Sequence, residues 1–150
     1  MNQVNYPTNK ILYTYAVLGG LVGGVLIGMV GMVGELDGIN DILDFIGSVL
    51  FIGIIGMFVG FIPATATGCL IAKFKFYKKP SHFVIISLIG FFTSFIFTLA
   101  FLFFRDNLSL ESVNDDLTIM SVMGLLGALS AIIIGWFVLP KSVIEYKESL

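Results

Sequence analysis

Four long stretches of this chain contain no charged residue, and they constrain the fold more than any other feature. The stretches are residues 11–33, 46–72, 83–104 and 117–139. Each is longer than the ~20 residues that a helix needs to cross about 30 Å of hydrocarbon. A membrane-spanning strand would need only about 9–11 residues of alternating polarity, and these stretches do not alternate. The sequence therefore predicts an all-α membrane protein with four transmembrane helices.

The remaining segments are too short to form a soluble domain. Only 12% of the residues are charged, whereas soluble domains typically contain about 25%. We therefore expect a single transmembrane domain over residues 1–150. The first apolar stretch is longer than the roughly 7–15 apolar residues typical of a signal peptide, so we expect it to be retained as a span.

Small residues recur at a spacing of four in the predicted spans, which places them on one face of each helix. In membranes such faces allow two helix backbones to approach closely. We expect these faces to pack together in a compact four-helix bundle. The predicted packing residues are Gly20, Gly24, Gly28, Gly56, Gly60, Ala64, Gly68, Ala72, Gly127, Ala131 and Gly135.

The second apolar stretch is longer than a bilayer requires, and it contains Pro63. A proline inside a helix cannot donate a hydrogen bond to the carbonyl four residues earlier. We therefore expect tilt, or a kink at Pro63, to absorb the excess length. Thr65 and Thr67 lie near enough to bond the freed backbone groups, so Pro63, Thr65 and Thr67 form the candidate intramembrane site. The alternative is that both hydroxyls serve only helix packing.

The charged residues are divided unevenly among the segments that flank the predicted spans. The two tails and the second connection hold every lysine, whereas the first and third connections are mostly acidic. Because short cytoplasmic loops are enriched in Lys and Arg, we predict that both termini are cytoplasmic. The acidic outer residues either bind cations or a basic partner, or are simply solvated. They are Glu35, Asp37, Asp41, Asp44, Asp106, Glu111, Asp115 and Asp116.

The second connection has the sequence KFKFYKKPSH and carries four lysines interleaved with aromatic residues. Each lysine close to an anionic membrane surface contributes about 1 kcal/mol of binding energy. The segment therefore predicts anionic-lipid contact, although the topology signal alone would also explain the cluster. The predicted contact residues are Lys73, Lys75, Lys78 and Lys79. We expect no nucleic-acid binding by so short a loop at the bilayer.

No Asp, Glu, Lys, Arg or His lies within the predicted spans, although such residues usually mark functional sites in membranes. With only Cys69 and His82 as soft ligands, the chain lacks the three or four clustered ligands of a zinc site. We expect no catalytic residue, metal or cofactor, and we predict that the protein is not an enzyme. The alternative is a pore lined by backbone carbonyls or by hydroxyl groups, as in a broken helix. Its candidate residues are Thr65, Thr67, Thr93, Ser94, Thr98 and Ser121.

The segment Ile62-Pro63-Ala64, followed by Thr67-Gly68, resembles an IPAxxTG-like run in small uncharacterised four-span bacterial inner-membrane proteins. The resemblance covers one span, implies a location in the bacterial inner membrane and carries no activity. The layout of four spans with both ends inside is also similar to that of immunity proteins against pore-forming bacteriocins. This second similarity concerns architecture alone.

Abundant small-residue packing faces and the lack of catalytic residues favour a non-catalytic, multi-pass inner-membrane protein that acts by helix–helix interaction. Such a protein would be an accessory, regulatory or immunity-type partner of another integral membrane protein, or would associate with itself in the lipid bilayer. The alternative is a homo-oligomeric channel or small-solute transporter that uses Pro63, Thr65 and Thr67.

Overall fold

The computed structural model describes residues 6–32, 39–106 and 113–140, and all regular structure in these ranges is helical. The predicted all-α class is therefore confirmed for the described residues. The elements are helices α1 (Thr8–Met32), α2 (Ile39–Val59), α3 (Phe61–Phe74), α4 (Pro80–Asp106) and α5 (Val113–Val138).

Helices α1, α4 and α5 each contain a stretch that is long and apolar enough to cross a membrane. Helices α2 and α3 meet this criterion only together, as segments Asp44–Val59 and Phe61–Phe74, which are bent by 64° at the break between them. The described residues thus contain three candidate spans, or four if the bent pair forms one span. Their length and composition are those of an integral membrane protein. The arrangement as a four-span bundle stays a prediction.

The break in the second span lies at Gly60 and not at Pro63, where the sequence predicted a kink. The last α2 bond runs from the Gly60 amide to the Gly56 carbonyl (2.7 Å), and the Ala64 amide bonds the Gly60 carbonyl (3.0 Å). Pro63 sits in the first turn of α3, where a missing N–H costs little. The proline acts three to four residues upstream, because it cannot donate to the carbonyl of Val59 and crowds that turn.

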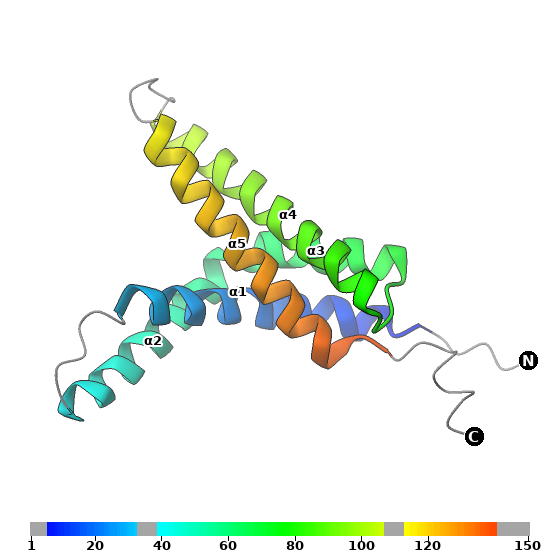
Figure 1. Ribbon diagram of the computed structural model, residues 1–150, viewed down its shortest axis with the longest axis horizontal. Helices are drawn as coiled ribbons and strands as arrows, with labels where there is room; N and C mark the ends of the chain where they lie inside the picture. Colours follow the sequence, from blue (N-terminus) through cyan, green and yellow to red (C-terminus); the bar gives the residue numbers. More distant parts are fainter. Residues whose placement is uncertain (1–5, 33–38, 107–112, 141–150) are drawn as a thin grey trace, which may run out of the picture.

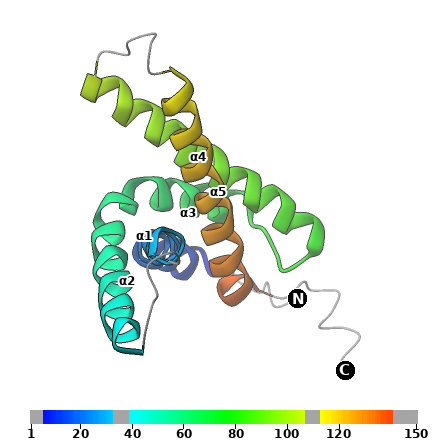
Figure 2. The same cartoon turned by 60° about the vertical axis from the view of Figure 1, so that its left-hand side comes forward.

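The helices form two antiparallel pairs, α1 with α2 and α4 with α5, and the pairs cross at a steep angle (Figures 1 and 2). Helix α3 lies between them and contacts both α1 and α4, while α5 contacts α1. Within the described residues, α2 contacts only α1 and α3. The outer part of the α4–α5 pair projects away from α1 and α2 (Figure 1).

The two pairs are held together at one end of the molecule, which we call the packed end. There the Tyr6 hydroxyl donates to the Phe76 carbonyl (2.7 Å), and the Lys78 amide donates to the Pro140 carbonyl (2.9 Å). The start of α1, the α3–α4 loop and the segment after α5 therefore meet. The largest fully buried side chains all lie near this end, and they are Ile11, Tyr15, Ile71 and Ile86. The opposite end of the molecule is called the open end.

Candidate functional site

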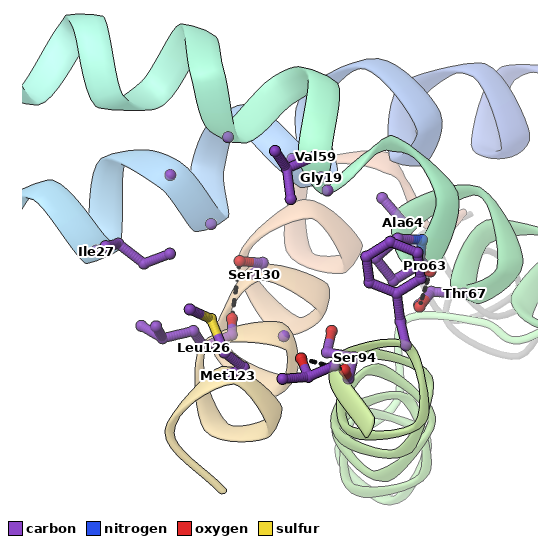
Figure 3. Close-up of a pocket in the computed structure, with 18 of the residues that line it drawn as sticks. Gly19, Ile27, Val59, Pro63, Ala64, Thr67, Ser94, Met123, Leu126 and Ser130 are labelled. Atoms are coloured by element: carbon purple, nitrogen blue, oxygen red, sulfur yellow. Dashed lines mark hydrogen bonds between the residues drawn. The ribbon is translucent and has the colours of Figure 1, made fainter. Parts of the chain in front are cut away.

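A groove of about 390 Å³ opens between the two helix pairs and is lined by residues from all five helices. The lining covers positions within residues 15–27 of α1, 94–102 of α4 and 119–134 of α5. The groove therefore runs from the packed core toward the open end. Figure 3 shows side chains of α1, α4, α5 and the α2–α3 bend surrounding one space. Its volume lies at the lower end of the ~300–1,000 Å³ range of small-molecule sites.

Tyr15 forms the inner end of the groove, where it meets the packed core. Its side chain is 1% exposed, and its hydroxyl donates to the Ala131 carbonyl at 2.8 Å. A tyrosine buried eight residues into an apolar helix needs such a hydrogen-bond partner for its hydroxyl. The bond joins α1 to α5. Sequence position alone places this ring near the lipid–water interface, and only the fold shows that it is buried.

The candidate intramembrane site of Pro63, Thr65 and Thr67 is divided by the fold. Pro63 and Thr67 line the groove, whereas Thr65 does not and donates its hydroxyl to the Phe61 carbonyl (2.7 Å). Thr67 is buried, bonds the Pro63 carbonyl (2.9 Å) and lies 2.6 Å from the Thr93 hydroxyl. The Thr67–Thr93 contact joins α3 to α4, so these hydroxyls also serve helix packing.

Hydroxyl groups on α4 and α5 line the walls of the groove. Thr98 donates to the Ser94 carbonyl (2.9 Å) and Ser130 to the Leu126 carbonyl (2.8 Å), and all four residues belong to the lining. Ser121, another hydroxyl candidate, is not part of it. Ser130 is not among the residues predicted from the sequence, because the predicted small-residue face of the last span contains its neighbour Ala131 instead. The groove thus offers an apolar wall with a few hydroxyl oxygens and no charged group.

The predicted packing glycines of α1 lie against the backbone of α2. A Cβ atom built on Gly20 would come within 2.5 Å of the Gly56 carbonyl oxygen, and one on Gly24 within 3.0 Å of the Gly56 Cα. A Cβ on Gly60 would come within 2.6 Å of the Gly20 Cα, and one on Gly28 within 3.1 Å of the Val49 Cα. Only glycine permits this approach of the two backbones.

The other predicted packing residues meet different neighbours. On α3, Ala64 faces Gly19 of α1, Gly68 faces Tyr15, and Ala72 is buried in the core. On α5, a Cβ built on Gly127 would meet the side chain of Ser94.

Two more α5 positions complete the set. The first is Ala131, whose Cβ would lie 2.6 Å from a Cβ built on Gly90 of α4. The second is Gly135, where an added Cβ would lie 3.0 Å from the Tyr15 hydroxyl. The predicted small-residue faces therefore lie at four different helix contacts, α1 with α2, α3 and α5 and α4 with α5, and do not form a single central seam.

The four lysines predicted to contact anionic lipid are not equivalent. Lys73 and Lys75 are exposed, while Lys78 and Lys79 are half-buried. The Lys78 Nζ lies 4.3 Å from the centre of the Trp136 ring, within the reach of a cation–π contact. Lys78 is therefore engaged with α5.

Tyr6 and His82 hold the α3–α4 loop to its surroundings. The His82 Nδ1 lies 3.0 Å from the Tyr77 amide, which can donate to it. Burial raises the pKa of Tyr6 to about 12, and the neighbouring Tyr77 adds to this shift. The phenol therefore stays a hydrogen-bond donor to Phe76 at neutral pH.

The predicted outer acids lie toward the ends of α2, α4 and α5 or in the segments that join the helices. Glu35, Asp37 and Glu111 lie outside the described residues, and Asp44 is exposed at the start of the α2 span. Within the described part of the chain, no three potential ligands lie close enough to hold a metal ion.

Comparison of the chain with protein-family models, curated proteins and solved structures finds no match.

Proposed function

We propose that this chain is a non-catalytic, multi-pass inner-membrane protein that binds a transmembrane helix of another membrane protein in its groove. Such a partner fits an accessory, regulatory or immunity-type role. The observation that carries the proposal is the groove itself, which is bordered by Gly23, where an added Cβ would meet only the Ser130 Oγ at 3.4 Å. Exposed backbone at such positions favours close approach by a helix.

The proposed topology treats α2 and α3 as one bent span, with four spans in a bundle and both termini cytoplasmic. Tyr6 and Pro140 lie at the same end as the lysine-rich loop, as an even number of crossings requires. The positive-inside rule then assigns the packed end to the cytoplasm. The groove would open toward the other side of the membrane.

The chemistry of the groove favours contact over catalysis. Its lining contains no carboxylate, imidazole, amine or thiol, so no lining group suits general acid–base work near neutral pH. The described hydroxyls of Thr67, Thr98 and Ser130 already donate to carbonyls of their own helices. A partner would therefore be recognised by the shape of the groove and by its apolar surface.

Site-specific photo-crosslinking in cells tests this function. A photoreactive residue at Met123, which lines the groove, should give an adduct with a second membrane protein, whereas one at Phe137, which is 81% exposed outside the groove, should not. Filling the groove with Gly23→Leu should abolish the adduct, because a Cβ there meets only the Ser130 Oγ at 3.4 Å. An adduct that survives Gly23→Leu, or adducts with lipid alone, would contradict the proposal.

The second candidate function is a homo-oligomeric channel or small-solute transporter. The observation that favours it is the position of Pro63 and Thr67 in the groove beside the broken helix. Broken helices of this kind form substrate sites in transporters. Thr65 has no part in this version, because it does not line the groove.

Swelling of proteoliposomes in glycerol and in urea tests the second candidate. Wild-type protein should raise the swelling rate above that of empty liposomes. Thr67→Val should reduce this increase, and the matched variant Thr65→Val should leave it unchanged. No increase with wild-type protein, or an equal effect of both variants, would remove this candidate.

A further inference from the structure

The charges of the described helices are separated between the two ends of the molecule. The lysines at positions 10, 73, 75, 78 and 79 all belong to the packed end, while the aspartates of α2, α4 and α5 occupy their opposite ends. No acid of the described residues lies near the lysine-rich loop. Among the described residues, the packed end therefore carries positive charge and no acid.

Lys73 and Lys75 are free to meet a partner, in contrast to Lys78. Both are exposed and flank Phe74, whose side chain is 61% exposed. Lys78 instead lies over the Trp136 ring and bonds Pro140 through its amide. A hydrophobic ring between two free ammonium groups matches the boundary between headgroups and acyl chains.

The backbone conformation of Lys75 also distinguishes this residue from the other lysines. Lys75 ends α3 in the left-handed conformation (φ 52°, ψ 53°), and it is the only residue other than glycine with positive φ in the described ranges. Glycine adopts this helix-terminating conformation without steric cost and is the usual residue there. A lysine adopts this conformation less readily than glycine does, so backbone geometry does not account for a lysine at this position.

We propose that Lys73, Phe74 and Lys75 form an anionic-lipid contact. The two ammonium groups bind phosphate groups of phospholipids in the leaflet at the packed end, and the Phe74 ring enters the acyl-chain boundary. Lys78 is excluded from this contact and holds the loop to α5. The inference is independent of the partner helix proposed for the groove.

Lipid selection in nanodiscs tests the assignment. The purified full chain is placed in nanodiscs with equal amounts of phosphatidylglycerol and phosphatidylcholine, and the lipids retained after release are identified by native mass spectrometry. Both leaflets of a nanodisc are accessible, so the orientation of insertion does not matter. Wild-type protein should retain phosphatidylglycerol preferentially, and less so at high salt.

Single variants with the same change of charge separate the roles of the lysines. Lys73→Gln and Lys75→Gln should each lower the preference for phosphatidylglycerol about fivefold. The matched control Lys78→Gln should leave the preference unchanged and lower the melting temperature. Lys75→Gly should lower the preference while raising the melting temperature, which a purely structural lysine would not do.

Two results would overturn the assignment. If all variants retain the wild-type preference, the lysines act only as a topology signal. If Lys78→Gln lowers the preference as much as Lys75→Gln, the total charge of the loop and not this contact selects the lipid.

Discussion

The packed end and the open end are made of similar apolar helices but differ in what those helices contact. At the packed end, α1, α3, α4 and α5 share one core around Tyr15 and Ile71. At the open end, each helix pair packs mainly on itself, and Phe104 of α4 is 87% exposed. Apolar composition therefore does not decide which half of a transmembrane helix is buried in protein.

The difference arises from backbone geometry and side-chain size together. The 64° bend at Gly60 directs α2 away from α4 and α5, so the second pair lacks a neighbour at the open end. Near the bend the small side chains of α1 and α3 leave the groove unfilled. At the packed end Ile11, Ile71 and Ile86 fill the space instead. The glycine contacts of α1 and α2 are close packing of another kind, backbone against backbone.

The largest expected effect comes from breaking the α1–α2 contact. Gly56→Leu should destabilise the protein by about 1–3 kcal/mol or more, because a Cβ there would come within 2.5 Å of the Gly24 Cα. The matched variant on the same helix is Gly47→Leu, since a Cβ at Gly47 has no neighbour within 4 Å. Thermal unfolding in detergent measures both. Equal melting temperatures for the two variants would show that the contact does not form.

The next effect concerns the bond between α1 and α5 at the inner end of the groove. Tyr15→Phe removes the hydroxyl that donates to Ala131 and should cost roughly 0.6–1.5 kcal/mol. Tyr13→Phe, at a side chain that is 69% exposed, should leave stability unchanged. Both are measured by thermal unfolding. A larger loss of stability for Tyr13→Phe than for Tyr15→Phe would show that the core contains the α1 face with Tyr13 and not the face with Tyr15.

A smaller effect distinguishes glycines on the two faces of α1. Gly23→Ala should leave the melting temperature unchanged or raise it, since the added Cβ lies 3.4 Å from the Ser130 Oγ and alanine favours the helix by about 1 kcal/mol. Gly20→Ala should lower it, because its Cβ would meet the Gly56 carbonyl. The same sign for both variants would contradict the open groove.

The smallest effect is a pH dependence at the packed end. Because the pKa of folded Tyr6 is about 12 against an ordinary value of 10.0, its contribution to stability is complete below pH 10 and is lost as the pH rises through 12. The difference in tyrosinate absorbance between wild type and Tyr6→Phe should therefore show a midpoint near pH 12. A midpoint near 10 would mean that Tyr6 is solvated and does not hold the loop.

Much of the fold could be predicted from the sequence, and the errors have local causes. The three uninterrupted spans follow from charge-free length. The sequence predicts tilt or a kink at Pro63, but a proline acts on the carbonyl four residues earlier, and the break falls at Gly60. Thr65 and Thr67 look alike in sequence, yet a two-residue step turns a helix by about 200°, and only Thr67 reaches the groove.

The sequence by itself determined that the chain is helical and suited to lipid, because a chain in hydrocarbon must satisfy its backbone hydrogen bonds internally. It also determined which of the segments that flank the apolar stretches carry lysine. Only the tertiary structure decided that Tyr15 is buried, that Lys78 is engaged with Trp136 while Lys73 and Lys75 are free, and that the groove opens at one end. These features depend on which helices meet and at what angle, and lipid solvates any apolar helix face about equally well, so periodicity alone does not choose between them.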